Sequence, residues 1–448
     1  MESKKQKIGN WFRTSISARM LVVGFIFLVL LVPLGIVEDL IRERGHRQTE
    51  VIQEINEKWG NEVVLFGPII KIPYKTYKEE KTFDAANKTY IKTYEEVHHH
   101  AYFLPKDLDI QATVDTKQLK RGIYESVVFT TDINIAGSFG EFDFGTQEIP
   151  EEEILWKKAS VLFKTTNLEG IQNEMTIDIL NATFALKPQF DNAHMGTLET
   201  TYLSIPTKEK APLNFTMAFQ VNGSERLQFV PIGKATTAQM KSDWHSPSFN
   251  GNFLPNDSTK QISKKGFEAH WKVLEANRQF GQQFFDKLPD LGTYAFGASL
   301  IIPVDDYQKT ERTSKYGLMI IGLTLLVFLL IQIISKIQIH PFQYLMIGLA
   351  LVMFYTLLIA ISEHQNYLTA YLLASIAVVG LITLYSRTIL KGFKFPLFIF
   401  TSMAVLYAFI FIIIQLEDYA LLVGSVGLFI ILATIMFASR KIDWNQSN

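Results

Sequence analysis

The sequence predicts an α-helical membrane protein with six transmembrane helices and one large, β-rich, sandwich-like domain outside the cytoplasm. Six long runs of apolar residues predict the helices, and a long polar segment between the first and second run predicts the domain. Within that segment, apolar and polar residues alternate with a period of two, which is typical of half-buried β-strands. Charged residues make up only 19% of the 448-residue chain, because few of them fall within residues 316–438.

The apolar runs are long enough to cross a bilayer, whose hydrocarbon core of about 30 Å requires roughly 20 helical residues. None of the six contains Asp, Glu, Lys, Arg or His. A buried helix of a soluble protein rarely runs this far without a charge, and five such runs follow one another here. The predicted transmembrane helices are residues 20–37, 316–334, 344–361, 368–385, 396–416 and 420–438.

The first run could also be the apolar core of a cleaved signal peptide. Such cores are about 7–15 residues long and are followed by small residues at the cleavage site. Residues 20–37 form a longer run, followed by Glu38-Asp39-Leu40-Ile41-Arg42 with no Ala-x-Ala-like site. We therefore interpret this run as a retained membrane anchor.

The distribution of Lys and Arg predicts the orientation, because short cytoplasmic loops are enriched in these residues. If the N-terminal tail, residues 1–19, is cytoplasmic, every basic cluster lies on the same side as the C-terminal tail, residues 439–448. The short loops on the other side, 362–367 and 417–419, contain no Lys or Arg. The basic residues concerned are Lys4, Lys5, Lys7, Arg13, Arg19, Lys336, Arg387, Lys391, Lys394, Arg440 and Lys441.

Residues 38–315 form the predicted outer domain. Its first part, about 38–60, has apolar residues at helical spacing and is expected to continue the first transmembrane helix. Three later segments, within 108–114, 123–135 and 213–221, alternate between apolar and polar residues and predict antiparallel strands. Because the chain contains no cysteine, the hydrophobic core rather than disulfides must stabilise this domain.

A β-hairpin is predicted at Asn222-Gly223, a frequent hairpin turn. A two-residue loop would place Leu227 on the polar face of the pair. A three-residue loop, 222–224, pairs Phe219 with Leu227 and keeps one apolar face. We therefore expect the three-residue loop.

The sequence contains none of the common catalytic or nucleotide-binding motifs. The Gly-rich dinucleotide and phosphate loops, H-E-x-x-H and G-x-S-x-G are all missing. His98-His99-His100 could suggest a metal site, but on a strand only His98 and His100 point the same way, and no carboxylate stands at a suitable spacing. We predict no enzyme activity, no cofactor and no metal, and interpret the histidines as an exposed strand end. The net charge of −1 gives no reason to expect nucleic acid as a partner.

The predicted spans contain neutral polar residues only, whereas ion-coupled transporters usually place ionisable groups inside the bundle. Gln332 is either a relay or substrate contact, or a partner in an interhelical hydrogen bond, and we favour the hydrogen bond. His340-Pro341 suits the first turn of the third helix, where the missing N–H of proline costs nothing. Glu363-His364 is either a functional pair or a solvated helix end, and we favour the helix end.

The segment from Trp244 to Pro255 contains too many Pro, Gly, Ser and Asn residues for a regular strand or helix. Its apolar side chains allow two interpretations. They either pack under the domain and fix a long loop to the core, or form an exposed surface that binds a partner. We favour the first, because a free apolar loop would promote aggregation. The side chains concerned are Trp244, Phe249, Phe253 and Leu254.

Several motifs of the chain resemble the CreD family of bacterial membrane proteins. The most specific of them is Ser242-x-Trp244-x-x-Pro247-Ser248-Phe249-x-Gly251-x-Phe253-Leu254-Pro255. The membrane segment resembles the family at Ile339-His340-Pro341-Phe342-Gln343-Tyr344-Leu345 and at Ser362-Glu363-His364. Further similar motifs, including Trp59-Gly60 and Arg121-Gly122-Ile123-Tyr124, extend the resemblance over almost the whole chain. One departure is Gln332, where a glutamate is common in the family.

The resemblance implies a bacterial inner-membrane, multi-pass protein whose outer domain lies in the periplasm. The family is associated with cell-envelope integrity, regulation by a two-component system, tolerance to certain colicins and responses to β-lactams. The resemblance also marks two sets of candidate residues. In the outer domain these are Trp244, Pro247, Phe249, Gly251, Phe253 and Pro255. At the membrane boundary they are His340, Pro341, Gln343, Glu363 and His364.

The expected function is therefore non-enzymatic support of envelope integrity or of an envelope stress response, through the periplasmic domain. The expected partners are the lipid bilayer and an envelope protein or cell-wall component. A transporter or lipid-handling protein is one alternative, and a co-purifying lipid or solute would favour it. A membrane-bound enzyme is the other, and an activity lost by a single substitution would favour it.

Overall fold

The computed structural model describes residues 16–84, 89–190, 195–206, 212–302, 306–335, 337–390, 392–416 and 419–440. Most of the predicted N-terminal tail, the C-terminal tail from Lys441 on, and the loop residues Lys336 and Lys391 lie outside these described residues. The chain divides into two compact units. The β unit comprises Val51–Pro303, and the helical unit comprises the residues before and after it.

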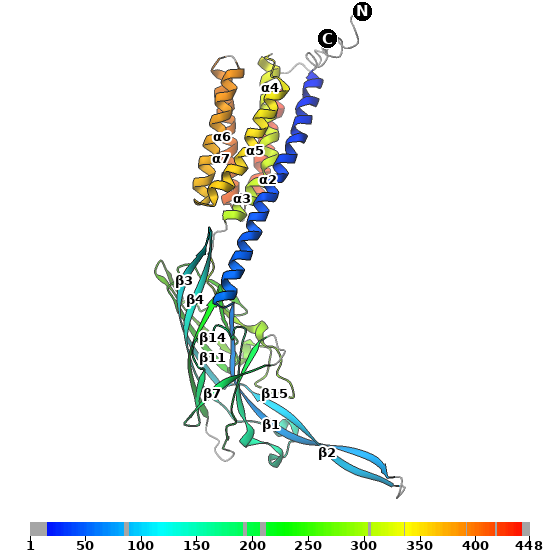
Figure 1. Ribbon diagram of the computed structural model, residues 1–448, viewed down its shortest axis with the longest axis vertical. Coiled ribbons are helices and arrows are strands. Elements are labelled where there is room, and N and C mark those ends of the chain that lie inside the picture. Colours follow the sequence, from blue (N-terminus) through cyan, green and yellow to red (C-terminus); the bar gives the residue numbers. More distant parts are fainter. Residues whose placement is uncertain are drawn as a thin grey trace, which may run out of the picture. The chain divides into compact units, whose positions relative to one another are not determined.

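The helical unit is built from long apolar helices, as predicted (Figure 1). Six helices in the described part of the chain are long and apolar enough to span a membrane, which confirms the predicted number. A short helix that the sequence did not predict, α3, precedes the second of them. The helices are α2 (Ile16–Trp59), α3 (Asp306–Lys315), α4 (Gly317–Ser335), α5 (Pro341–Ser362), α6 (Tyr367–Ile389), α7 (Lys394–Gln415) and α8 (Ala420–Ser439).

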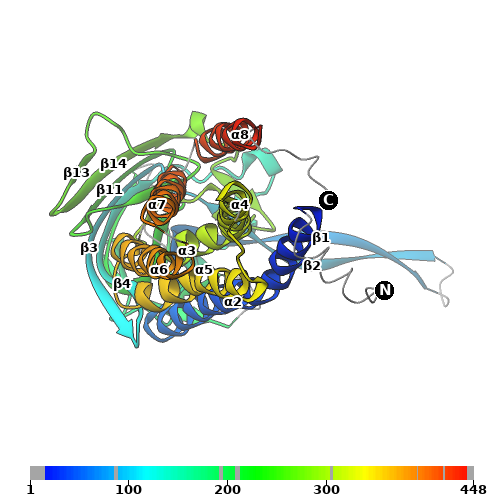
Figure 2. The ribbon, with the colours of Figure 1, turned by 90° about the horizontal axis from the view of Figure 1, so that it is seen from above.

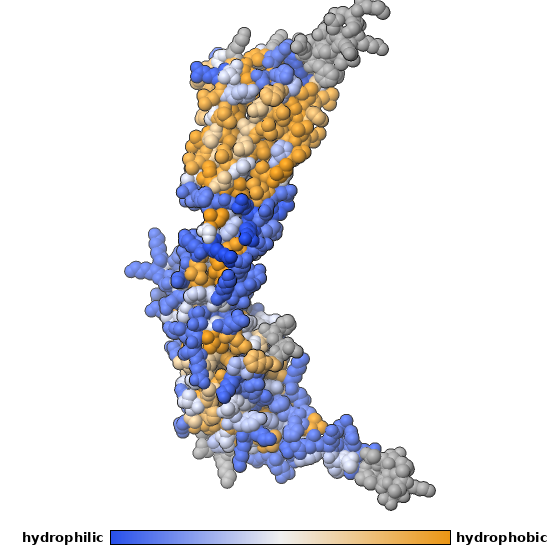
Figure 3. Space-filling view, viewed as in Figure 1, coloured by the Kyte–Doolittle hydropathy of each residue, from blue (hydrophilic) through white to orange (hydrophobic). Residues whose placement is uncertain are grey.

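Helices α2 and α4–α7 share a core of buried apolar and aromatic side chains, whereas α8 lies at the edge of the bundle against α7 (Figure 2). Gly427 of α8 faces the ring of Phe409, and its lack of a side chain lets the two helices approach closely. None of the described side chains of α8 is fully buried. The face of the bundle seen in Figure 3 is covered mainly by apolar residues, as expected of a surface that contacts lipid.

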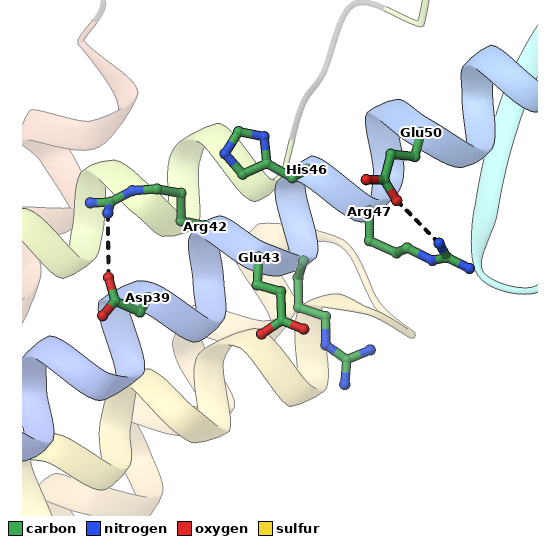
Figure 4. A pocket seen from close by; sticks show the side chains of 7 residues that line it. Asp39, Arg42, Glu43, His46, Arg47 and Glu50 are labelled. Carbon is green, nitrogen blue, oxygen red and sulfur yellow. Dashed lines mark hydrogen bonds and ion pairs between the residues drawn. The ribbon is translucent and has the colours of Figure 1, made fainter.

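Helix α2 is continuous over 44 residues, which confirms the prediction that the first transmembrane helix extends beyond its apolar part. From Arg42 to Glu50 its side chains are exposed or half-buried on all sides, so this stretch has no apolar face. Two ion pairs between successive turns stabilise it, Arg42 with Asp39 at 3.3 Å and Arg47 with Glu50 at 3.1 Å (Figure 4). From Val51 on, the helix belongs to the β unit.

The β unit contains sixteen strands within the described residues, most of them formed where apolar and polar side chains alternate. The first eight are β1 (Val63–Asp84), β2 (Thr89–Phe103), β3 (Asp107–Arg121), β4 (Tyr124–Phe139), β5 (Ser160–Thr165), β6 (Thr176–Ile179), β7 (Ala182–Gln189) and β8 (Gly196–Thr200). The others are β9 (Leu213–Ser224), β10 (Arg226–Phe229), β11 (Ala235–Ser242), β12 (Ser248–Gly251), β13 (Gln261–Ser263), β14 (Gly266–Leu274), β15 (Gln283–Phe285) and β16 (Phe296–Ser299).

The strands form one mixed, open sheet, so the predicted sandwich is not confirmed. Its main path runs β12-β16-β10-β1-β5-β8-β7-β6-β9-β4-β3-β11-β14-β13, and β2 and β15 extend it beside β1. Two neighbouring pairs are parallel, β1 with β10 and β3 with β11. The remaining pairs are antiparallel, as predicted for the alternating segments. Parallel neighbours come from distant parts of the chain, which a local pattern does not reveal.

The core of the β unit lies on the apolar faces of the long strands. Along β3, Leu108, Ile110, Ala112 and Val114 are all buried, and β9 buries every second residue from Phe215 to Val221. In the segment 123–135, the alternating residues from Val127 to Ile135 are buried as well, although Ile123 at its start is exposed. These alternations therefore predicted the correct faces.

The predicted hairpin at Asn222-Gly223 is wrong. Strand β9 continues through both residues to Ser224, where it pairs with β4, and Glu225 then takes a left-handed backbone conformation with φ +59°. The chain leaves β9 at this point, and β10 pairs with β1 and β16 instead. Leu227 and Phe229 are fully buried between these other strands. Their apolar alternation therefore reflects the pairing of β10 with β1 and β16, and not a hairpin with β9.

The β unit should fold without the helices, because its apolar faces cover one another. We expect residues 51–303 to be soluble on their own and to give a far-ultraviolet circular dichroism spectrum dominated by β-structure. The matched control is the full chain in detergent, whose spectrum gains the helical contribution. Insolubility, or a mainly helical spectrum of the isolated unit, would contradict this expectation.

Candidate functional site

The segment from Trp244 to Pro255 lies against the core of the β unit. Trp244 is only 4% exposed, its indole N–H donates to the carbonyl of Ser246 at 3.0 Å, and its backbone N–H donates to the hydroxyl of Ser242 at 3.1 Å. Pro255 is buried, and Pro247 is half-buried. Leu254 is the exception, since 72% of its surface is exposed.

The two phenylalanines of this segment pack edge-on against buried aromatic rings. The ring centroid of Phe249 lies 5.7 Å from that of Phe267 and 5.8 Å from that of Trp271. Phe253 lies 6.1 Å from Phe296, and its carbonyl accepts a hydrogen bond from the indole of Trp271 at 3.2 Å. These contacts are those of a loop fixed to the core, with most of its aromatic surface covered.

Part of the segment is a strand, which the sequence analysis did not expect. Residues Ser248–Gly251 form β12 and pair with β16, with Phe249 opposite Ala298. The strand ends at Gly251, whose φ of +92° favours glycine. A Cβ atom at this position would lie 2.1 Å from the carbonyl oxygen of Ala295, so the close approach of the two strands also requires glycine.

The membrane-boundary residues begin helix α5. The His340 side chain accepts a hydrogen bond from the N–H of Phe342 at 3.2 Å, and the Gln343 side chain accepts one from the N–H of His340 at 2.9 Å. With Pro341 in the first turn, this reciprocal arrangement is a capping box. One residue further, the Tyr344 hydroxyl donates to the side-chain oxygen of buried Gln332 at 2.5 Å. Gln332 thus makes the interhelical hydrogen bond that we favoured.

Glu363 and His364 lie at the opposite end of α5. Glu363 directly follows the last residue of the helix and caps it, and it forms an ion pair with Arg44 of α2 at 3.6 Å. His364 is exposed. Because α5 has 22 residues and a helix rises about 1.5 Å per residue, His340 and Glu363 are separated by roughly 33 Å. The predicted boundary residues therefore mark two ends of one helix and do not form one site.

A cluster of buried tyrosines inside the helical unit was not predicted. The rings of Tyr355, Tyr371 and Tyr407 lie 4.9, 5.4 and 4.8 Å from that of Phe354, all edge-on. The Tyr371 hydroxyl donates to the carbonyl of Tyr407 at 2.7 Å, and Tyr367 shares a hydrogen bond of 2.7 Å with Thr313 of α3. The sequence signal was the position of two of these tyrosines, since Tyr355 and Tyr407 lie within the apolar runs and away from their ends.

Several buried hydroxyls of the bundle have no hydrogen-bond partner among the described residues. They include those of Thr324 on α4, Tyr355 on α5 and Tyr407 on α7. A buried hydroxyl without a partner costs free energy, so each of these groups would gain from a water molecule or a polar ligand group.

A polar cluster in the β unit was also not predicted from the sequence. The Asp286 carboxylate lies 2.6 Å from Nδ1 of His99 and accepts a hydrogen bond from the Tyr74 hydroxyl at 3.2 Å. Nε2 of His99 lies 2.9 Å from the Thr76 hydroxyl. Burial, together with the nearby Asp286 carboxylate, raises the pKa of Tyr74 to about 12, so its hydroxyl stays protonated. The cluster joins the loop after β15 to the paired strands β1 and β2.

The other two histidines of the run have separate surroundings. His98 lies 3.0 Å from the Glu96 carboxylate, and His100 is half-buried. Burial lowers the pKa of His100, and the positive charge of Lys71 adds to this effect. Within the part of the chain that the structure describes, no three His, Asp or Glu side chains come together as a metal site.

An open hollow lies along the polar stretch of α2 (Figure 4). Seven residues of this helix alone line it, four basic or histidine and three acidic. Arg42, Arg47 and Arg44 each have a carboxylate within 3.6 Å, so the positive charges are already paired. The lining residues are Asp39, Arg42, Glu43, Arg44, His46, Arg47 and Glu50.

Comparison with known proteins agrees with the motifs of both units. The family model described as inner membrane protein CreD matches residues 15–445. The chain belongs to the CreD family. A relative, the inner membrane protein CreD of Escherichia coli strain K12, is 28% identical over 430 residues, which cover 93% of this chain and 91% of the relative. The resemblance noted in the sequence is thereby confirmed, and the chain is a multi-pass protein of the inner membrane.

Proposed function

We propose that this CreD-family protein supports the integrity of the cell envelope, or an envelope stress response, without catalysing a reaction. In this proposal the β unit lies in the periplasm and both termini lie in the cytoplasm. The β unit acts by binding an envelope protein or a cell-wall component. The basic residues of the loops support the proposed orientation of the chain in the membrane. The connection between helix α2 and the β unit supports the proposed role of the β unit.

Hydrogen bonds connect the end of α2 to several parts of the β unit. The Asn56 amide donates to the Glu225 carboxylate at 2.9 Å and accepts from the Ser126 hydroxyl at 2.7 Å. The Trp59 indole donates to the carbonyl of Phe129 at 3.1 Å. Because the same helix is continuous back to Ile16, the β unit is joined to the first transmembrane helix without an intervening loop. This connection is the observation that carries the proposal, since it suits a protein that reports on or braces the envelope.

The proposal is tested by complementation in cells that lack the chain. The full chain should restore resistance to envelope stress, such as detergent or a β-lactam. A version in which a flexible linker replaces residues 60–302 should reach the membrane but fail to restore resistance. Full rescue by that version would refute the proposed role of the β unit. Photo-crosslinkers on the β unit in intact cells would then identify the bound component.

The proposed orientation predicts the outcome of reporter fusions. Fusions after Val37 and after Lys315 should both give the signal of the periplasm, because these positions flank the β unit. Fusions at Lys391 and at the C-terminus should give the signal of the cytoplasm. A periplasmic signal at Lys391 would contradict the six-span arrangement.

A second candidate, a lipid-handling or transport function, is favoured by the buried hydroxyls of Thr324, Tyr355 and Tyr407 that lack partners among the described residues. Mass spectrometry of the gently purified full chain would decide it. A specific lipid or solute retained by the natural chain and lost in Tyr407→Phe, but kept in the exposed control Tyr419→Phe, would support this function. Only bulk lipid in all three samples would exclude it.

A further inference from the structure

The paired strands β1 and β2 extend beyond their neighbours as a two-stranded ribbon (Figure 1). They pair continuously from Ile70 opposite Phe103 to Asp84 opposite Thr89. Strand β5 accompanies β1 only as far as Lys71, and β15 accompanies β2 only at residues 101–103. We call the remainder, residues 75–84 and 89–98, the arm. Within the described residues no further strand pairs with it.

Ion pairs across the two strands hold the arm together. Lys75 lies 2.7 Å from Glu96, and Lys92 lies 3.0 Å from Glu79. The first of these contacts lowers the pKa of Glu96, which keeps its carboxylate ionised. A two-stranded ribbon is nevertheless only marginally stable in water, and its unpaired edges are a template for a further strand.

The same short sequence occurs in both strands of the arm. It is Lys-Thr-Tyr-x-Glu, at residues 75–79 in β1 and at residues 92–96 in β2. Its Lys, Tyr and Glu are alternate residues, so they share one face of the ribbon. The motif is self-complementary, because two copies aligned antiparallel with tyrosine opposite tyrosine place each lysine opposite a glutamate. Opposite charges and paired aromatic rings are both favourable cross-strand contacts.

Only the motif in β2 has an open edge beside it among the described residues. In β1, the neighbouring segment Glu151–Glu153 approaches the edge, since the Tyr77 hydroxyl donates to the Glu153 carboxylate at 3.2 Å and the N–H of Leu155 donates to the carbonyl of Pro73 at 2.9 Å. In β2, Tyr94 is 63% exposed, and β15 is the nearest strand along that edge. The edge of β2 is therefore the one that can accept a second copy.

We propose that two copies of this chain associate through the free edge of β2, with Tyr94 on the two-fold axis. Lys92 of each copy then lies opposite Glu96 of the other, and Thr93 lies opposite Glu95. The two arms form a four-stranded sheet, which is more stable than an isolated two-stranded ribbon because each arm gains further paired strands. The interface uses the same surface on both copies, so association stops at two. This inference does not depend on the proposed envelope function.

Single cysteines can test the arrangement directly, because the natural chain contains none. Residues directly opposite each other in an antiparallel pair have Cα atoms about 4.5–5.5 Å apart, which lies within the range of a disulfide. Full chain carrying Tyr94→Cys, treated with a mild oxidant in native membranes, should form a disulfide-linked dimer on a non-reducing gel. The matched control Lys78→Cys, exposed on the other strand, should form at least several-fold less.

The register is tested by combining two variants. Thr93→Cys and Glu95→Cys, expressed together with different tags, should cross-link to each other more than either does alone. The natural chain in detergent should also have the mass of a dimer by light scattering. A monomer at every concentration, cross-linking of Tyr94→Cys no greater than that of Lys78→Cys, or no preference of the 93–95 combination would each overturn the proposal.

Discussion

Replacing Trp244 with alanine is expected to lower the free energy of unfolding of the β unit by about 3–5 kcal/mol. The side chain is 4% exposed and belongs to the main hydrophobic core of the unit, so its removal leaves a cavity that the surrounding rings cannot fill. It also removes the hydrogen bond from the indole to the carbonyl of Ser246. Urea unfolding of residues 51–303, or of the full chain in detergent, followed by circular dichroism, gives the difference.

The matched control is Leu254→Ala, in the same segment. Leu254 is 72% exposed, and substitutions of this kind usually change stability by less than about 0.5 kcal/mol. An unchanged unfolding curve for Trp244→Ala, combined with loss of envelope resistance, would show that the segment binds a partner. The packing interpretation of Trp244 would then have to be abandoned.

Gly251→Ala should destabilise the β unit by roughly 3 kcal/mol, from backbone strain and from overpacking together. The φ of +92° disfavours any residue with a side chain, and the new Cβ would lie 2.1 Å from the backbone oxygen of Ala295, the residue directly before β16. Since a backbone atom cannot rotate away, β12 would have to separate from β16. Hydrogen exchange at Phe249 and Ala298, which are paired across these strands, should become faster.

Gly122→Ala separates the two causes. Gly122 has a φ of +64°, but nothing lies within 4 Å of the position of its Cβ, so only the backbone strain of about 1 kcal/mol is expected. Equal losses of stability in the two variants would show that the close approach of β12 and β16 contributes nothing.

Most of the helical unit could be predicted from sequence because the bilayer imposes a simple rule. A span must be long, apolar and internally hydrogen-bonded, and each predicted run corresponds to one such helix. Helix α3 escaped this rule because it is short and polar, with buried Thr310 and Thr313. The hydrogen bond of Gln332 to Tyr344 was expected in kind, since a buried amide needs a partner, but the sequence did not identify the partner.

In the β unit, local alternation predicted the faces of strands but not their neighbours. Burial of Leu108, Phe215 and Phe229 follows directly from apolar residues at period two. The same pattern led to the wrong hairpin at 222–224, because β10 is apolar at alternate residues for a different reason, its place between β1 and β16. The two parallel pairings join strands that lie far apart in the chain, and no short-range pattern encodes them.

The candidate residues show the same limit. The packing of Trp244 and Phe249 was foreseen, because large apolar side chains in an irregular segment need cover. The cluster of Tyr74, His99 and Asp286 was not, since Tyr74 and Asp286 are 212 residues apart and meet only through the sheet. The repeated Lys-Thr-Tyr-x-Glu motif is visible in the sequence. Its proposed role in association could be inferred only once the structure showed which strand edges are open.

The end of α2 can complete its contacts only late in the synthesis of the chain. Asn56 bonds to Glu225, which follows it by 169 residues. At a synthesis rate of roughly 5–20 residues per second, ~10–30 s pass between the appearance of the two residues. During that interval β1 has no β10 beside it, and its edge stays open. A chain arrested before residue 226 therefore presents an uncovered strand edge that can pair with other chains.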